Sequence, residues 1–234
     1  MYRLDRVDTV QVQLPDNSTQ SQIFSRSAWL RVTTTKAGSG LRATVVLDSL
    51  DVTGLPRNAT GPIDSARGTE WTASVAPNGE LSDIAANRKT LVGEQLGAML
   101  QLLFPMLPGE SVRAGATWTD TTNATTKVDL FDVREQAVTE YVAMSSAARG
   151  GRTALPIQAN TSFTQQGSTT QGGQALQIEA KGNRRFTYYI GLDGVPAGLA
   201  GNETSEVDVT VSAVGQSIRA ARTASVTVTP LPVR

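Results

Sequence analysis

Residues 71–79 read Trp-Thr-Ala-Ser-Val-Ala-Pro-Asn-Gly, and residues 186–194 read Phe-Thr-Tyr-Tyr-Ile-Gly-Leu-Asp-Gly. Both segments open with an aromatic residue and threonine, carry a β-branched residue at the fifth place, and close with Asn-Gly or Asp-Gly. These closing dipeptides are the strongest short-range signal for a tight turn between two β-strands. The segments lie 115 residues apart in a chain of 234, close to half its length. We therefore expect two related halves, residues 1–104 and 112–234, joined by residues 105–111.

Long strands are expected on both sides of these segments. Residues 2–14, 23–35 and 41–52 place apolar side chains at every second position, which is the period of a strand with one buried face. Turn-forming residues separate them at 15–18 and 38–40. The second half reads as strands throughout, and we place them near residues 126–133, 138–144, 154–165, 175–180, 184–192, 206–214 and 217–229.

One segment has a helical pattern. From about residue 83 to residue 104 the apolar residues recur near i, i+3, i+4 and i+7. Either Ser82 or Asp83 can cap the start, and Pro105 ends the helix. Residues 54–68 before it are expected to form a loop, the best candidate for a mobile or ligand-gating segment. The fold class expected is α+β, mainly antiparallel β: a single domain with a curved sheet or open barrel and one amphipathic helix on its concave side.

The composition excludes several kinds of chemistry. The chain has no Cys and no His, so thiol nucleophiles, imidazole bases and ordinary zinc or haem ligands are absent. Its 21 basic and 21 acidic residues make up only 18% of the chain, which is too sparse and too even for a nucleic-acid-binding stripe. No apolar run is long enough to span a membrane. We expect no cofactor and no metal.

Carboxylates are the acid and base groups that remain. Asp48 and Asp51 lie three positions apart, as do Asp129 and Asp132. In a strand that spacing places the two side chains on opposite faces, so neither pair forms a catalytic dyad by itself. The other carboxylates that folding could bring to a cleft are Glu70, Glu179 and Asp208. No catalytic residue is therefore expected, and a carboxylate-dependent hydrolase is only a distant alternative.

Eight large apolar or aromatic side chains are the candidates for lining an apolar cavity inside the curved sheet. The same residues would otherwise form a filled core, which is the commoner fate of such side chains. They are Trp29, Trp71, Trp118, Phe163, Phe186, Tyr188, Leu96 and Met99.

The chain also resembles a known group in its short motifs. Leu107-Pro108 precedes a Val-x-x-Gly-x-x-Trp segment from Val112 to Trp118. With residues 71–79, this pattern resembles an uncharacterised group of bacterial exported β-rich proteins. More distantly, the expected fold is similar to periplasmic lipoprotein carriers and mycobacterial lipid-binding lipoproteins. That second likeness is one of fold and implies an apolar cavity. The strand pattern begins at once after Met1, so either the protein is not exported or a signal peptide has been removed from this chain. We favour removal, and with it a place in the periplasm or cell envelope of a bacterium. No functional residue is carried over from either group.

Three functions follow as expectations. The first is a non-enzymatic cell-envelope protein that binds an apolar ligand, in the manner of a lipid or lipoprotein carrier. The second is an accessory or scaffold subunit that docks on and stabilises a larger membrane protein complex. A carrier would leave an unfilled cavity between helix and sheet, whereas a scaffold would have a filled core and a broad exposed strand edge. The hydrolase is the third.

Overall fold

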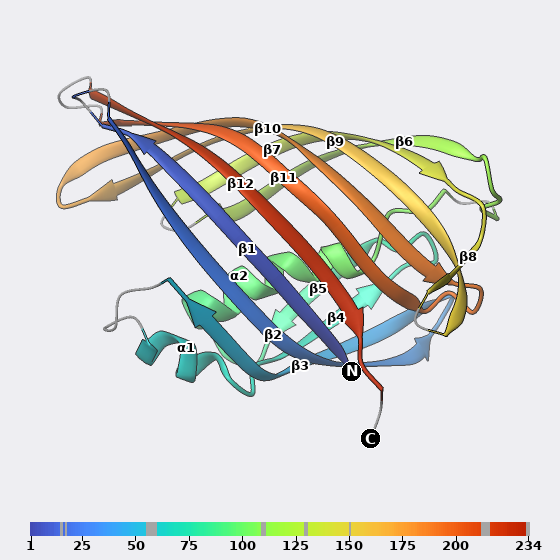
Figure 1. Cartoon of the computed structure of the whole chain (residues 1–234). Coiled ribbons are helices and arrows are strands. Elements are labelled where there is room, and N and C mark those ends of the chain that lie inside the picture. The colour runs from blue at the N-terminus through green and yellow to red at the C-terminus, as the bar shows by residue number, and fades with distance from the viewer. Residues whose placement is uncertain are drawn as a thin grey trace.

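The computed structural model describes residues 1–14, 16, 18–54, 60–108, 111–128, 131–149, 151–211 and 216–232. Most of them form antiparallel strands in one curved, unclosed sheet with two short helices, which confirms the expected fold class (Figure 1). The elements are β1 (Tyr2–Gln13), β2 (Thr19–Ala37), β3 (Gly40–Thr53), α1 (Thr60–Ala66), β4 (Glu70–Val75), β5 (Leu81–Ala86), α2 (Leu91–Met99), the 3-10 helix η2 (Leu100–Leu103), β6 (Thr117–Val128), β7 (Phe131–Ala143), β8 (Ala147–Arg149), β9 (Arg152–Gln171), β10 (Gln174–Gly191), β11 (Pro196–Val211) and β12 (Gln216–Pro230).

The order of strands in the sheet is β5-β4-β3-β2-β1-β12-β11-β10-β9-β7-β6, with the short β8 paired to β9. The first and last strands of the chain therefore lie together in the middle of the sheet. The backbone N–H of Leu231 donates to the carbonyl of Met1 at 2.8 Å, and the two termini lie side by side in Figure 1. Both edges, β5 and β6, are consecutive strands in the chain. Their connection crosses the concave side and carries α2.

The curvature of the sheet has local causes. The pairing register shifts at Trp29/Leu30 between β2 and β3, at Thr72/Ser74 between β4 and β5, and at Tyr189/Ile190 between β10 and β11. Such irregularities bend a strand and increase its twist. With strands of up to 20 residues, these bends curl the sheet around the helix.

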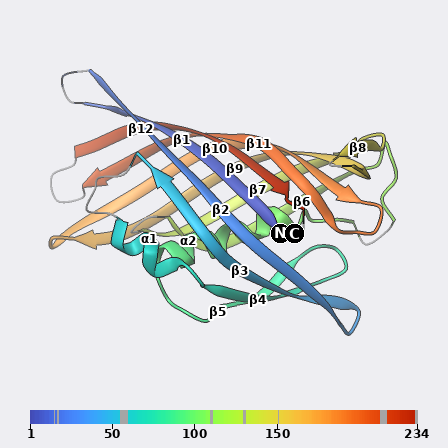
Figure 2. The same cartoon turned by 60° about the horizontal axis from the view of Figure 1, so that its bottom comes forward.

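The core fills the space between the concave face and the helical connection. Figure 2 shows α2 between the arm formed by β3 to β5 and the arm that carries β7, β9 and β10. Leu96 and Leu100 of the connection are buried against the sheet. The sheet contributes Leu4, Leu30, Leu47, Leu50, Trp71, Tyr141, Ile157, Phe186, Tyr188, Leu199, Val226 and Val228.

The expected helix is confirmed, but it begins at Leu91 and not near residue 83. Residues 81–86 form β5 because they pair with β4 across the turn that Asn78 and Gly79 make. The cap is Thr90, whose side-chain oxygen accepts a hydrogen bond from the Gly93 N–H at 3.0 Å. Tertiary pairing thus overrides the helical spacing of residues 83–90.

Other expected boundaries also differ. Residues 126–133 were expected to form one strand, but they end β6 and begin β7, and 129–130 lie outside the described residues. Two strands were expected at 175–180 and 184–192, where β10 runs unbroken. The expected loop at 54–68 contains α1. Three parts of the expected segments lie outside the described residues. They are 55–59 of this loop, 15 and 17 of the first expected turn, and 212–214 of the strand expected at 206–214.

Candidate functional site

The two similar segments form turns of the same geometry. The N–H of Gly79 donates to the Ala76 carbonyl at 2.9 Å, and the N–H of Gly194 donates to the Gly191 carbonyl at 2.8 Å. Both glycines have positive φ angles, 83° and 79°, a conformation that favours glycine. Asn78 and Asp193 each accept, through their side-chain oxygen, the N–H two residues on, at 3.2 and 3.1 Å. We call these two turns, 76–80 and 191–195, the twin turns.

The twin turns border one mostly apolar pocket of about 480 Å³, here called the end pocket. The crossover residues Leu107 and Pro108 and the nearby Val112 also line it, so the motifs singled out in the sequence converge there. The backbone N–H of Leu107 holds the crossover to one turn by donating to the Asn78 carbonyl at 2.7 Å. The full lining is Pro77, Asn78, Leu107, Pro108, Ser111, Val112, Leu155, Ile190, Gly191, Leu192 and Gly194.

Trp118 holds the other side of the crossover in place. Its indole N–H donates to the Met106 carbonyl at 3.0 Å, and its ring stacks on that of Tyr141 with centroids 5.0 Å apart. Two independent contacts thus position residues 106–108 over the end of the sheet. The wall of the end pocket that they form is therefore built into the fold.

The eight candidates for a cavity lining are distributed over three places. Four lie in the core cluster and two pack against it. Phe163 is buried outside that cluster, under the guanidinium of Arg184 at 4.0 Å, and Trp29 lies on the opposite face of the sheet with the Arg3 guanidinium 5.3 Å from its ring. The core members are Trp71, Leu96, Phe186 and Tyr188, and the two packed against them are Met99 and Trp118.

Close packing marks the contact between helix and sheet. A Cβ atom added at Gly97 would stand 2.9 Å from Nε1 of Trp71, so the helix backbone rests on that ring. Leu96 of α2 and Leu100 just after it are both buried in the same core cluster as Trp71. Among the residues that the structure describes, the helix side of the sheet is thus a packed core where the six candidates meet. Whether any of them contacts a ligand stays a prediction.

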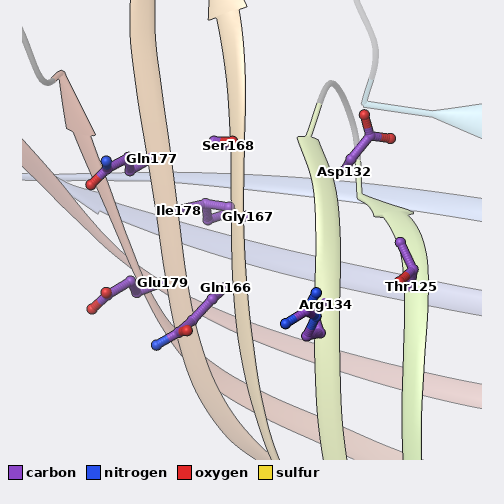
Figure 3. Close-up of a pocket in the computed structure, with 9 residues that line it drawn as sticks. All are labelled: Thr125, Asp132, Arg134, Gln166, Gly167, Ser168, Gln177, Ile178 and Glu179. Carbon is purple, nitrogen blue, oxygen red and sulfur yellow. The ribbon is translucent and has the colours of Figure 1, made fainter.

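A second pocket, of about 420 Å³, lies on the outer face near the far ends of β7, β9 and β10 (Figure 3). Its polar side chains alternate with the fully buried Val133, so they point away from the core. Asp132 and Glu179 both belong to it, yet Figure 3 shows their carboxyl groups on opposite sides of the pocket. This arrangement offers no paired carboxylates of the kind that a glycosidase uses.

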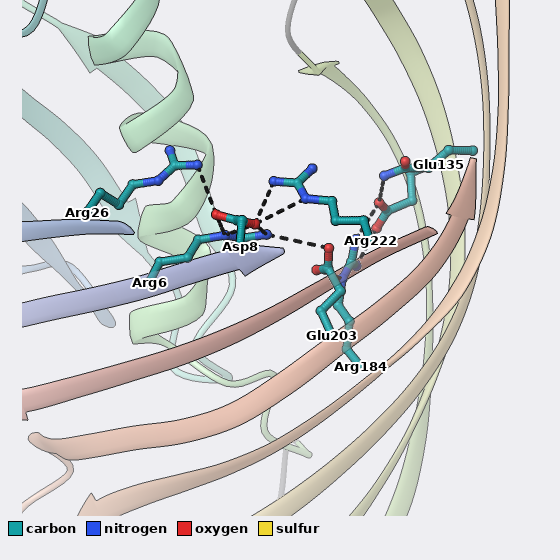
Figure 4. Close-up of polar contacts among 8 residues, drawn as sticks. Arg6, Asp8, Arg26, Glu135, Arg184, Glu203 and Arg222 are labelled. Atoms are coloured by element: carbon teal, nitrogen blue, oxygen red, sulfur yellow. Dashed lines mark hydrogen bonds and ion pairs between the residues drawn. The ribbon is translucent and has the colours of Figure 1, made fainter. Parts of the chain in front are cut away.

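A chain of charged side chains crosses the concave face over the neighbouring strands β2, β1, β12, β11, β10, β9 and β7 (Figure 4). At one end, Asp8 accepts hydrogen bonds from Arg6 at 3.0 Å and Arg222 at 2.8 Å, and Arg26 reaches it at 3.4 Å. At the other end, Arg184 forms two hydrogen bonds of 2.7 Å with Glu135. Glu203 links the ends, at 2.9 Å from Arg184 and 3.6 Å from Arg6. We call these seven residues the arginine network.

The network favours the ionised form of two of its carboxyl groups, those of Asp8 and Glu135. Burial by itself would raise the pKa of Asp8, but hydrogen bonds and charges from Arg6 and Arg222 outweigh it and lower that pKa. The pKa of Glu135 is lowered in the same way by Arg184. Burial also raises the pKa of Tyr141 to about 12. Near neutral pH the carboxyl groups of Asp8 and Glu135 are therefore ionised and cannot donate a proton, and Tyr141 stays protonated.

The described residues contain no cluster of side chains that could bind a metal ion. No three Asp or Glu residues there are grouped closely enough to hold an ion. The described helices are also all too short or too polar to cross a membrane.

Comparison of this chain with protein-family models, with curated proteins and with solved structures finds no match. The resemblance to bacterial exported β-rich proteins stays a prediction.

Sequence reasoning missed the pocket and the network for different reasons. Leu155 of the end pocket is an ordinary strand residue, and only its pairing with Ile190 places it beside the turn at 191–195. In β1, Arg6 and Asp8 do occupy the alternate positions that Leu4 shares. Two charges in the buried register of an otherwise amphipathic strand are a signal that could have been found.

Proposed function

We propose that the protein is a non-enzymatic binding protein of the cell envelope that receives an apolar ligand, such as part of a lipid, in the end pocket. The observation that supports this most is the pocket itself. Its volume of about 480 Å³ falls in the range of about 300–1,000 Å³ typical of small-molecule sites. Its walls are mostly apolar, with a few backbone and amide groups at the twin turns.

The rim of the end pocket adds a second line of support. Leu192 at the tip of one twin turn is 75% exposed, and the neighbouring Val195 is 41% exposed. Isolated apolar residues on a surface are common, but here they adjoin an apolar pocket. An occupant that covered Leu192 would gain roughly 1.5–3 kcal/mol from that side chain.

The proposed place differs from the one that a carrier-like fold suggests. A cavity between helix and sheet would place the ligand beside Trp71 and Leu96, where the core is packed. The end pocket lies instead where the crossover meets the twin turns. The ligand we propose is therefore a small apolar group or one end of a longer chain.

The test uses an uncharged dye whose fluorescence rises in apolar surroundings. Leu192→Asp should weaken dye binding about tenfold, because it places a charge at the rim of the pocket. Ile23→Asp is the matched control: Ile23 is 60% exposed on β2, on the face opposite the core. Both variants should keep the stability of the wild type. Equal dye affinity in wild type and Leu192→Asp would reject the proposal.

Docking on a larger complex is the second candidate. Two observations favour it. The core between helix and sheet is packed, as we expect of a scaffold, and both edges of the sheet are open, because β5 pairs only with β4, and β6 only with β7, among the described residues. Most residues of β5 are exposed, and an unpaired edge can accept a strand from another protein. Native mass spectrometry of protein purified from its own source separates the candidates. A bound lipid supports the first, and a bound protein supports the second.

A further inference from the structure

The arginine network divides the concave face into two apolar regions. On one side lies the core, with Leu4 and Ala28 next to the network in β1 and β2. On the other side the same face continues toward the ends of β1, β2, β11 and β12. We call its apolar residues there the apolar shelf: Val10, Val12, Phe24, Val207, Val209 and Ile218.

The apolar shelf is incompletely covered. Five of its six residues are half-buried, and Ile218 is 49% exposed. Figures 1 and 2 show β1 and β2 running past both helices toward this end of the molecule. The part of β12 from Gln216, its first residue, to Arg222 is roughly 20 Å long at about 3.3 Å per residue. The shelf is therefore long enough to lie along an extended alkyl chain.

Positive charge exceeds negative charge at the inner border of the shelf. The network contains four arginines and three carboxylates. Asp8 is the carboxylate nearest the shelf, and three guanidinium groups surround it. The side chain of Asp8 is only 3% exposed, whereas those of Arg26 and Arg222 are 25% and 28% exposed.

Arg26 is the least compensated of these cations. Its one ion pair with a described residue is the 3.4 Å contact with Asp8, which Arg6 and Arg222 contact more closely. Burial lowers the pKa of Arg26, and the charges of Arg6 and Arg222 lower it further against the attraction of Asp8. Figure 4 shows Arg26 and Arg222 on either side of Asp8, each with nitrogens directed away from it. No buried side-chain nitrogen in the described residues lacks a partner, so these spare donors reach solvent.

We propose that the apolar shelf and the Arg26–Arg222 pair form a second binding site, for a long-chain carboxylate whose head group bonds the two guanidinium groups. Guanidinium groups match carboxylates in geometry and charge. The bound carboxylate would balance the four arginines with a fourth negative charge. Its alkyl chain would cover Phe24 and the valines of the shelf, which removes their surface from water. This site is separate from the end pocket, which lies near the opposite end of β1, where Tyr2 bonds Pro196.

The test compares dodecanoate with dodecanol and acetate by titration calorimetry on delipidated protein, below the micellar concentration. Dodecanoate should bind at least about tenfold more tightly than the uncharged alcohol and the short anion. Arg26→Gln should lower the affinity for dodecanoate about tenfold, so that dodecanoate no longer binds more tightly than dodecanol. Ile218→Asp should also lower the affinity for dodecanoate, because it places a charge where the alkyl chain of the ligand would lie.

Two control variants match these changes. Arg31→Gln removes an exposed arginine of the same strand, which pairs with Asp48, and Ile23→Asp changes an exposed isoleucine on the other face. Neither should alter dodecanoate binding. Arg26→Gln is expected to fold, because Asp8 keeps its closer bonds to Arg6 and Arg222, and circular dichroism checks this.

Four results would overturn the site. Equal affinity for dodecanol would show that charge plays no part, and equal affinity for acetate would show a simple anion site. Absence of dodecanoate binding, or an unchanged affinity in Arg26→Gln, would show that the arginine pair is a structural tie. Dye binding at the end pocket is measured with an uncharged probe and the Leu192 variant, so either proposal can fail without the other.

Discussion

Asp8 forms ion pairs with arginines from three strands. It belongs to β1, and the guanidinium groups that contact it come from β1, β2 and β12. Removing such a carboxylate leaves buried cations without a counter-charge, which costs more than the pair itself contributes.

Asp8→Asn should lower the free energy of unfolding at neutral pH by about 3–5 kcal/mol, measured by urea denaturation. The control is Asp48→Asn, which removes the partner of Arg31, a side chain 61% exposed. An exposed pair contributes about 1 kcal/mol or less. Equal losses in the two variants would contradict the role given to Asp8.

Acid should weaken the fold through the same carboxylates. The folded-state pKa values of Asp8 and Glu135 are lowered, so the unfolded chain binds protons first as the pH falls. Their stabilisation is complete above the unfolded pKa of about 4, and it is lost progressively as the pH falls from there through the folded pKa. The urea midpoint of the wild type should therefore drop between about pH 5 and about pH 2. Asp8→Asn should show a shallower drop, and an equally steep one would contradict this assignment.

At the scale of elements, the sequence pattern predicted β1, β2, β3 and the twin turns, because they depend on local signals. It misplaced the start of α2, since residues 81–86 are held by β4, their partner across a turn. It also predicted two strands, 175–180 and 184–192, where β10 runs unbroken through Gly182. A Cβ there would stand 2.7 Å from the Phe163 ring. The glycine is thus explained by a neighbour in space, which no local pattern shows.

Gly97 shows the same effect in a helix. Alanine normally stabilises a helix interior over glycine by about 1 kcal/mol. Here the new Cβ would press on the Trp71 ring, so Gly97→Ala should instead destabilise by roughly 1–3 kcal/mol. In a Trp71→Phe background the cost should shrink, and a double-mutant cycle in urea measures this coupling. A more stable Gly97→Ala would show that helix and ring do not touch as described.

At the scale of the molecule, the end pocket and the arginine network both depend on long-range pairing. The end pocket needs residues of both halves, and the network spans seven neighbouring strands. The sequence pattern predicted the twin turns and the crossover, but not that they lie together. They lie together because β1 pairs with β12 and so joins the two halves into one sheet. The related origin of the halves stays a prediction, although the two twin turns have the same hydrogen bonds.

The pairing of β1 with β12 leads to a prediction about connectivity. Because the termini lie side by side, a short Gly-Ser linker can join them, and new ends can be opened between Gly172 and Gly173. Both glycines have positive φ angles, and an added Cβ at either would meet nothing within 4 Å, so this turn carries no packing. The permutant should fold with a single urea transition close to that of the parent.

A second permutant provides the contrast. Opened between Ala180 and Lys181, it breaks β10 where that strand pairs with both β9 and β11, beside the arginine network. It should lose cooperative unfolding or fail to fold, because the break falls in the middle of the sheet that both candidate sites require. If the first permutant failed like the second, the adjacency of the termini would not be what holds the two arms together.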